Sequence, residues 1–374
     1  MPKNPFRIVR QVPGFTETLA RKPRLAVSVL KSIAVRKARA RMGLPSLSAL
    51  EYAATYACQA TCGHCSAAGL TDHARERERL ETWEVQSIAK EAFALGVYEV
   101  NITGGEPSLR KDLPDLVQCF APERTFIGLN SNGDLLDFEA VRTLRDAGVD
   151  LLKLSLDSHI PEVHDAGRGL PGNHAHVVDL LDMTADLFGM RGHICTVGSS
   201  EAIRSGAAAA LIKLAEDHDA TIGFTLPVAV GRWGGQYEMM LPDEDLDALR
   251  GLCDHPRAFF QGSVGTASFA CPAGRTEIYV TADGDVLPCP FIQRSFGNVR
   301  KKRLEPITQD ILRAVERAGG GSLCLAGESL KWMKANVPEA RDRVDLPSCA
   351  TEHEGSFCRD PVSGDAVGAP TRSP

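Results

Sequence analysis

Short apolar segments alternate with longer amphipathic segments through the middle of the chain. The apolar segments have the length of buried strands and lie at residues 48–54, 97–103, 126–130, 151–155, 193–197 and 222–226. Amphipathic segments with a helical period follow several of them, at residues 81–95, 138–147 and 174–188. Alternating strands and helices predict a parallel sheet, and right-handed crossovers curl such a sheet toward a barrel. We therefore expect an α/β fold with a partial (β/α)6 TIM-like barrel.

The pattern changes after the sixth apolar segment. An acidic helical run at residues 242–252 follows a glycine-rich stretch, and strands at residues 277–281 and 285–287 flank a turn that contains Gly284, which predicts a hairpin. The chain ends in a segment rich in proline, glycine and serine, which is typical of disorder. These changes predict a basic helical N-terminal extension, the barrel, a bridging segment, a small second domain and a disordered tail, with bounds at 1–47, 48–230, 231–270, 271–360 and 361–374.

Local signals mark the ends of the first long helix, at residues 81–95. Thr82 is its expected N-cap, and Gly96 follows its last residue. Composition agrees with a folded chain, because 43% of the 374 residues are hydrophobic and 24% are charged.

The charge of the chain is unevenly distributed. Its formal net charge is −6, yet residues 1–43 contain eleven lysines and arginines against one acid, Glu17. Such an extension either packs on the main domain or contacts an anionic membrane surface, an acidic peptide or nucleic acid. Nucleic acid is the weakest of these partners, because the remaining chain is acidic and aromatic residues are sparse in the extension. The apolar stretch at residues 25–35 is too short to span a membrane, since a spanning helix needs about 20 apolar residues. We expect a cytoplasmic protein, with peripheral membrane contact through the extension as an alternative.

Three of the eleven cysteines, Cys58, Cys62 and Cys65, lie within eight residues of one another. This C-x3-C-x2-C spacing favours metal ligation over a disulfide framework. Four thiolates saturate a [4Fe–4S] cluster, so a three-cysteine loop leaves one iron open for another ligand. Thiolates that hold iron also require a reducing compartment, which agrees with a cytoplasmic location.

The cysteine loop resembles the defining motif of the radical S-adenosylmethionine (SAM) superfamily, whose open iron binds the amino and carboxylate groups of SAM. The family usually has an aromatic residue before the last cysteine, where this chain has His64. Further segments resemble family motifs at the ends of later strands, where α/β barrels place their chemistry. The resemblance assigns to SAM binding Gly104, Gly105, Glu106, Asn132, Ser155, Asp157 and Arg168. Ser155 and Arg168 are expected at the SAM carboxylate, an anion that suits a guanidinium fork.

A second cysteine group resembles the SPASM and twitch domains of this superfamily, which hold auxiliary iron–sulfur clusters. Twelve residues separate Cys271 from Gly284, and four more separate Gly284 from Cys289. The rest of the full SPASM pattern is absent, so a twitch-like domain with a single auxiliary [4Fe–4S] cluster is expected. Its ligands would be Cys271, Cys289, Cys324 and one of Cys349 and Cys358.

The resemblance implies a radical SAM enzyme. A flavodoxin or ferredoxin would reduce the first cluster, SAM would be cleaved to a 5′-deoxyadenosyl radical, and that radical would abstract hydrogen from a substrate that is then oxidised or otherwise modified. Relatives act on ribosomally made peptides or on small metabolites. Residues 1–47 are too short and too basic for the peptide-recognition module that many peptide-modifying members carry, which favours a small metabolite or a lipid. A peptide maturase is the first alternative; a nucleic-acid modifying enzyme and a non-catalytic iron–sulfur or zinc protein are the others.

Overall fold

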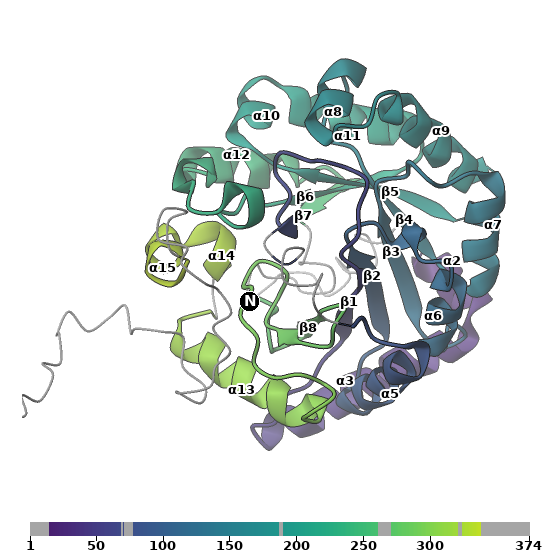
Figure 1. Ribbon diagram of the computed structural model, residues 1–374, viewed down its shortest axis with the longest axis vertical. Coiled ribbons are helices and arrows are strands. Elements are labelled where there is room, and N and C mark those ends of the chain that lie inside the picture. The colour runs from purple at the N-terminus through teal and green to yellow at the C-terminus, as the bar shows by residue number, and fades with distance from the viewer. Residues whose placement is uncertain are drawn as a thin grey trace, which may run out of the picture.

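The computed structural model describes residues 15–68, 70, 78–186, 190–260, 271–320 and 324–337. In this part of the chain, nine strands form one sheet in the order β7-β6-β5-β4-β3-β2-β1-β8-β9 (Figure 1). Every neighbouring pair is parallel except β8 and β9. The strands are β1 Ala49–Thr55, β2 Glu99–Gly104, β3 Phe126–Ser131, β4 Leu151–Ser155, β5 Arg191–Val197, β6 Thr221–Thr225, β7 Ala258–Phe260, β8 Glu277–Val280 and β9 Val286–Leu287. The expected α/β class is confirmed.

Helices surround the curled sheet on its outer side (Figure 1). They are α2 Phe15–Arg21, α3 Pro23–Arg41, α5 Thr82–Leu95, α6 Leu113–Cys119, α7 Phe138–Ala147, α8 Pro161–Arg168, α9 Asn173–Asp186, α10 Ser200–Arg204, α11 Ala207–Asp217, α12 Asp243–Leu252, α13 Leu304–Arg317, α14 Leu325–Glu328 and α15 Leu330–Asn336. Short 3-10 turns add η1 Pro107–Leu109, η2 Gly231–Trp233 and η3 Tyr237–Met239. The bounds of α7 and β4 are those that the sequence pattern predicts.

The first long helix differs from its prediction at one end. Its N-cap is Glu81 rather than Thr82, because the backbone N–H of Glu81 donates to the Glu84 carboxylate at 2.8 Å in a capping box. Thr82 is the first helical residue. The other end is as expected, since Gly96 adopts a left-handed conformation with φ of 104° and ends α5.

Alternate strand residues face two different environments. Leu50, Ile102, Leu129 and Leu154 are fully buried in the core. The residue that follows each of them is polar and lines a cavity inside the curled sheet; these residues are Glu51, Thr103, Asn130 and Ser155. Because strand side chains alternate between two faces, one run of residues serves both the core and the cavity.

The sheet crosses the predicted domain boundaries. The bridging segment contributes β7, which pairs with β6, and the hairpin of the expected small domain contributes β8, which pairs in parallel with β1. The predicted hairpin itself is present, because β8 and β9 pair antiparallel around the turn at Gly284. Cys271 and Cys289 of the second cysteine group therefore flank strands that continue the barrel sheet.

The described part of the basic extension packs under the amino ends of the strands. Lys22 Nζ donates to Asp150 Oδ2 at 2.6 Å and to the carbonyl oxygens of Gly148 and Thr125 at 3.1 and 3.4 Å, in the segments that lead into β4 and β3. Leu25 is completely buried. Packing on the main domain is thus the observed arrangement of α2 and α3, at the end of the barrel opposite the carboxyl ends of the strands.

Two further predictions have separate outcomes. No helix of the described residues is long and apolar enough to cross a membrane. The expected disordered tail, together with Cys349 and Cys358, lies outside the described residues.

Candidate functional site

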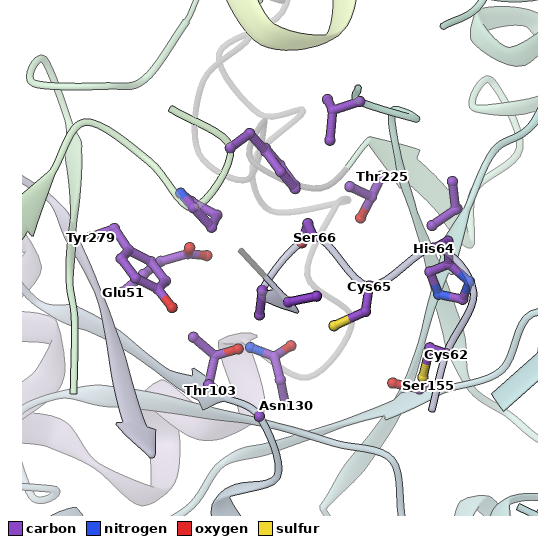
Figure 2. A pocket seen from close by; sticks show the side chains of 18 of the residues that line it. Glu51, Cys62, His64, Cys65, Ser66, Thr103, Asn130, Ser155, Thr225 and Tyr279 are labelled. Atoms are coloured by element: carbon purple, nitrogen blue, oxygen red, sulfur yellow. The ribbon is translucent and has the colours of Figure 1, made fainter. Parts of the chain in front are cut away.

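A cavity of about 1000 Å³ opens at the carboxyl ends of the strands. Its wall includes residues from the ends of β1 to β6 and both predicted cysteine groups. Figure 2 shows Cys62 and Cys65 of the first group together with the strand-end residues Thr103, Asn130, Ser155 and Thr225. The cysteines that line it are Cys58, Cys62, Cys65, Cys271, Cys289 and Cys324. Two cysteine groups that are separated by about 200 residues in sequence therefore line the same cavity.

The first cysteine loop follows β1 and is held by backbone hydrogen bonds from two sides. Thr61 N–H donates to the Arg168 carbonyl at 2.9 Å, at the end of α8. The N–H of Arg232 donates to the Cys65 carbonyl at 3.0 Å. No larger residue fits at the neighbouring Gly231, because a Cβ there would lie 2.2 Å from the Cys65 carbonyl oxygen.

Two side-chain donors approach the sulfur atoms of this loop. Arg168 Nη1 lies 3.8 Å from Cys62 Sγ, and Asn132 Nδ2 lies 3.8 Å from Cys58 Sγ. Burial raises the pKa of the Cys58 thiol, and it raises that of Cys62 although Arg168 opposes the shift. Thiolates in this environment need compensating positive charge, which a cluster core supplies together with these donors. The residues present therefore fit a three-thiolate iron–sulfur site.

Arg168 is fixed by a carboxylate behind it. Its Nε and Nη2 atoms donate to the two oxygens of Asp157 at 2.8 and 3.0 Å. Burial alone would raise the pKa of the Asp157 carboxyl, but the guanidinium outweighs burial and holds the pKa below its usual value. His64 Nε2 lies 3.6 Å from Asp157, and burial lowers the pKa of this histidine. Asp157 thus orients Arg168, and Arg168 faces the cavity.

The second motif packs closely against the end of β1. Gly105 N–H donates to the Thr55 carbonyl at 2.7 Å. Gly104 has a φ of 136°, and a Cβ at this position would lie 2.1 Å from the same carbonyl oxygen. Only glycine fits this approach, which places both glycines in the cavity wall.

Glu106 has a different place from the one that the resemblance assigns to it. Its side chain is completely buried and accepts hydrogen bonds from Ser131 Oγ and Asn132 N, each at 2.8 Å. Ser108 supplies two further donors, Oγ at 2.6 Å and N at 3.1 Å. All of these donors belong to the chain, so Glu106 holds the loop that carries Asn132. Of the seven expected SAM residues, those that line the cavity are Gly104, Gly105, Asn132, Ser155 and Arg168.

The second cysteine group gathers Cys271, Cys289 and Cys324 from three separate segments. Burial raises the pKa of Cys271, raises that of Cys324 to about 12, and holds that of Cys289 well above its usual range. The other two thiols add to the shift at Cys289, and all three cysteines line the same cavity. Within the described ranges, no three histidine, cysteine or acidic side chains converge as the ligands of a single metal ion do.

Two family models match this chain. The model of the radical SAM superfamily matches residues 52–198, which contain the first cysteine loop and the strand ends around the cavity. The model of the SPASM iron–sulfur cluster-binding domain matches residues 271–324. The chain is a radical SAM protein of the SPASM/twitch branch.

Membership in the radical SAM superfamily establishes the class of protein and its cofactors. The protein is an enzyme that uses SAM and a [4Fe–4S] cluster, and its SPASM domain implies auxiliary cluster binding. The alternative of a non-catalytic iron–sulfur or zinc protein is therefore set aside. Cys119, Cys195 and Cys253 do not line the cavity.

Similar radical SAM proteins come from several bacteria. The mycofactocin maturase MftC of Mycobacterium ulcerans is 29% identical over 264 residues, which cover 67% of this chain and 70% of the relative. The PqqA peptide cyclase of Streptomyces rochei is 27% identical over 260 residues, which cover 63% of this chain and 67% of the relative. The structure of Streptococcus suis SuiB bound to precursor peptide SuiA has a TM-score of 0.58 at 18% identity, over 73% of this chain and 67% of that one. The last likeness concerns the fold alone.

Several residues in the cavity wall, or directly behind it, escape prediction from the sequence of this radical SAM enzyme. Gln59 Nε2 donates to Asn132 Oδ1 at 3.3 Å and to Asp134 Oδ2 at 3.0 Å, and so ties the cysteine loop to the end of β3. Glu51 and Glu277 line the cavity from inside the barrel. Their signal in the sequence is a charged residue within an otherwise apolar strand.

Proposed function

We propose that this radical SAM enzyme modifies a ribosomally made peptide. The supporting comparisons are MftC, which is named as a maturase, and the PqqA peptide cyclase. The chain also shares its fold with SuiB, whose structure holds a precursor peptide. They favour the peptide over the small metabolite or lipid that the sequence suggested. The short basic extension is a poor guide to the substrate, because its described part, α2 and α3, lies at the other end of the barrel from the cavity.

One observation carries the proposal. The cavity of about 1000 Å³ joins the first cysteine loop to the second cysteine group, so an inserted residue would lie between the two. When bound, the cluster and SAM supply the reductive cleavage of SAM to methionine and a 5′-deoxyadenosyl radical, which abstracts a hydrogen atom. The chain's own part is to enclose the inserted residue and exclude water from it.

The roles of individual residues follow from their places in the wall. Cys58, Cys62 and Cys65 would hold the SAM-cleaving cluster, and Arg168 would meet the SAM carboxylate with Ser155 beside it. Gly104, Gly105 and Asn132 would contact SAM. Glu106 and Asp157 would act through the loop and the guanidinium that they hold. Cys271, Cys289 and Cys324 would hold one auxiliary cluster, with Cys349 or Cys358 as fourth ligand.

The proposal includes an electron donor and a location. A flavodoxin or ferredoxin would supply the electron, and a cytoplasmic location suits iron-ligating thiols. A lipid substrate delivered by membrane contact through α3 is disfavoured. Lys22 anchors this helix at the amino ends of β3 and β4, so a membrane bound there would lie far from the opening.

The test uses anaerobically reconstituted full-length protein with dithionite and SAM. Short peptides encoded beside the gene are added, 5′-deoxyadenosine is measured by chromatography, and the peptides are analysed by mass spectrometry. We expect 5′-deoxyadenosine to form and one peptide to change in mass. Cys62→Ser should abolish both results, whereas Cys119→Ser, whose sulfur lies 3.4 Å from the Thr82 and Asp115 carbonyl oxygens outside the cavity, should not.

Two outcomes would overturn the proposal. Intact protein that makes no 5′-deoxyadenosine would exclude radical SAM cleavage. Protein that makes it, but modifies a free metabolite and none of the peptides, would exclude the peptide as the substrate.

A further inference from the structure

Two glutamates line the part of the cavity that lies inside the barrel. Glu51 belongs to β1 and Glu277 to β8, and the parallel register of these strands pairs Ala49 with Glu277 and Glu51 with Tyr279. The two carboxylates are therefore one inward-facing step apart along neighbouring strands. Figure 2 shows Glu51 beside Tyr279 on one wall, with Thr103 and Asn130 on the adjoining wall.

Neither carboxylate has a partner of its own. Within the described part of the chain, no hydrogen bond and no ion pair within 4 Å involves the side chain of Glu51 or Glu277. Other carboxylates with little or partial exposure, such as Glu106, Asp150 and Asp157, hold a donor or a cation from the chain. Glu51 and Glu277 are half-buried in the cavity wall, where a carboxylate largely withdrawn from bulk water is costly without a partner, so the pair is suited to a ligand that the chain itself does not supply.

The nearby lysine, Lys153, donates to a side chain other than the two glutamates. Lys153 extends from β4 across Gly128 of β3, where a Cβ would lie 3.1 Å from the lysine Cε, and its ammonium donates to Asn101 Oδ1. Asn101 in turn donates to Glu99 at 3.2 Å. The lysine therefore completes a chain of contacts on β2, and it reaches Glu51 and Glu277 only through its electric field.

The pKa shifts of Glu51 and Glu277 also favour a bound cation. Burial raises the pKa of Glu51 although Lys153 opposes the shift. The pKa of Glu277 lies well above its usual range, because burial and then the neighbouring Glu51 both oppose its ionisation. Glu99 adds to this repulsion. A cation between the two carboxylates would relieve the repulsion and supply the missing donors.

We propose that Glu51 and Glu277 bind a cationic group of the substrate, an ammonium or a guanidinium, inside the barrel. The inference rests on the proposed function, because the bound group would hold the substrate in the cavity that the cysteine loop closes. Such a cation is the end of a lysine or arginine side chain in a peptide, or of a free alkylamine. A planar guanidinium and a tetrahedral ammonium both offer several donors to two carboxylates.

The binding test uses reconstituted full-length protein with SAM under anaerobic conditions. Isothermal titration calorimetry would compare butylammonium and butylguanidinium with the neutral 1-pentanol, whose length lies between theirs. We expect both cations to bind at least about tenfold more tightly than the alcohol. Glu51→Gln and Glu277→Gln should each weaken cation binding about tenfold and leave alcohol binding unchanged. Glu139→Gln, on an α7 side chain that is 70% exposed, is the matched control and should change neither.

A second arm identifies the source of the cation. N-acetyl-lysine methylamide and N-acetyl-arginine methylamide carry the peptide backbone that butylammonium lacks. If either blocked amino acid binds more tightly than butylammonium, the cation belongs to a peptide side chain. If butylammonium binds more tightly than both, the cation belongs to a free amine, and the carboxylate pair is still its binding site.

The inference fails if the cations bind no more tightly than 1-pentanol, or if both glutamine variants bind them as the wild type does. Iron and sulfide content and circular dichroism would check that the variants fold. If a variant loses its clusters, the preference of the wild type for cation over alcohol still decides. The proposed function is judged separately from the 5′-deoxyadenosine made by the wild-type sample.

Discussion

At the scale of single residues, the polar groups at the strand ends divide into those that face the cavity and those that hold its wall. The two carboxylate oxygens of Glu106 accept hydrogen bonds from four donors of the chain. Both oxygens of Asp157 accept hydrogen bonds from Arg168. A buried carboxylate with its hydrogen bonds satisfied is a rigid support rather than a free ligand. The residues behind the wall therefore fix the residues in it, as Glu106 does for Asn132.

The sequence does not separate these two kinds of residue. Both kinds follow predicted strands, and the family motifs include both. Glu106 and Gly105 are neighbours in the chain, yet only the glycine lines the cavity. What decides is the direction of each side chain within the turn, which depends on partners such as Ser131 that are distant in sequence.

A buried histidine gives a prediction for the dependence of stability on pH. His193 is 1% exposed, stacks on Phe259 at 5.0 Å and forms a 2.9 Å hydrogen bond with Thr221 Oγ1. Burial, with Lys153, lowers its pKa to about 3. The folded protein therefore keeps this histidine neutral while the unfolded chain, with a pKa of about 6.5, takes up a proton as the pH falls.

The sign follows from this difference in protons bound. Between about pH 6.5 and pH 3 the unfolded chain binds more protons, so stability falls as the pH falls through this range. The contribution of His193 between pH 7 and pH 5 is about 2 kcal/mol. Urea unfolding at both pH values would measure it, with His193→Gln as the variant that lacks the titrating group. An equal pH 7 to pH 5 loss in wild type and variant would contradict the prediction.

At the scale of helices and strands, long periodic elements are predictable and short edge elements are not. The pattern predicts α7 and β4 at their observed bounds, since each has a clear period and clear ends. It misses β7, which has only three residues, and the five-residue α10. It identifies the β8–β9 hairpin but not its partner, because pairing of β8 with β1 joins segments more than 200 residues apart.

The attachment of α2 and α3 to the barrel yields a prediction at this scale. Lys22 holds Asp150, whose side chain is only 3% exposed, through a 2.6 Å ion pair. Lys22→Met should destabilise the protein by about 3 kcal/mol, because it leaves a buried carboxylate without its cation. Urea unfolding at neutral pH would measure the change.

Two further variants show whether the ion pair is the cause. Lys31→Met changes an exposed residue of α3, the helix that Lys22 precedes as its N-cap, and should alter stability by less than about 0.5 kcal/mol. The double variant Lys22→Met with Asp150→Asn should recover part of the loss, since the buried charge is then gone. A loss below about 1 kcal/mol for Lys22→Met would mean that the extension does not depend on this contact.

At the scale of the whole molecule, the two cysteine groups meet because one sheet carries both. The first group follows β1, and the segment from Cys271 to Cys289 contains β8, the strand paired with β1. The described part of the basic extension, α2 and α3, lies at the other end of the barrel. The basic side chains of these two helices are thus separated from the opening, which the net charge of −6 does not reveal.

Iron content tests the arrangement of the cofactors. Two [4Fe–4S] clusters require about eight iron atoms and eight sulfides per chain. Replacing Cys58, Cys62 and Cys65 together by alanine should leave about four irons and remove SAM cleavage. Replacing Cys271 and Cys289 by alanine should also leave about four, because one cluster loses two of its thiolates. Reconstituted samples would be compared by iron and sulfide analysis and by electron paramagnetic resonance after reduction.

The same measurement locates the fourth ligand of the auxiliary cluster. Cys349→Ser and Cys358→Ser should differ, because under the proposed assignment one thiolate would complete the set of Cys271, Cys289 and Cys324 and the other would not. The ligand's variant should change the auxiliary resonance and lower its iron content, and the other should match Cys119→Ser. Identical spectra for both variants and the wild type would mean that neither Cys349 nor Cys358 is the fourth ligand. One iron of the auxiliary cluster would then be open to a ligand from the substrate in the cavity.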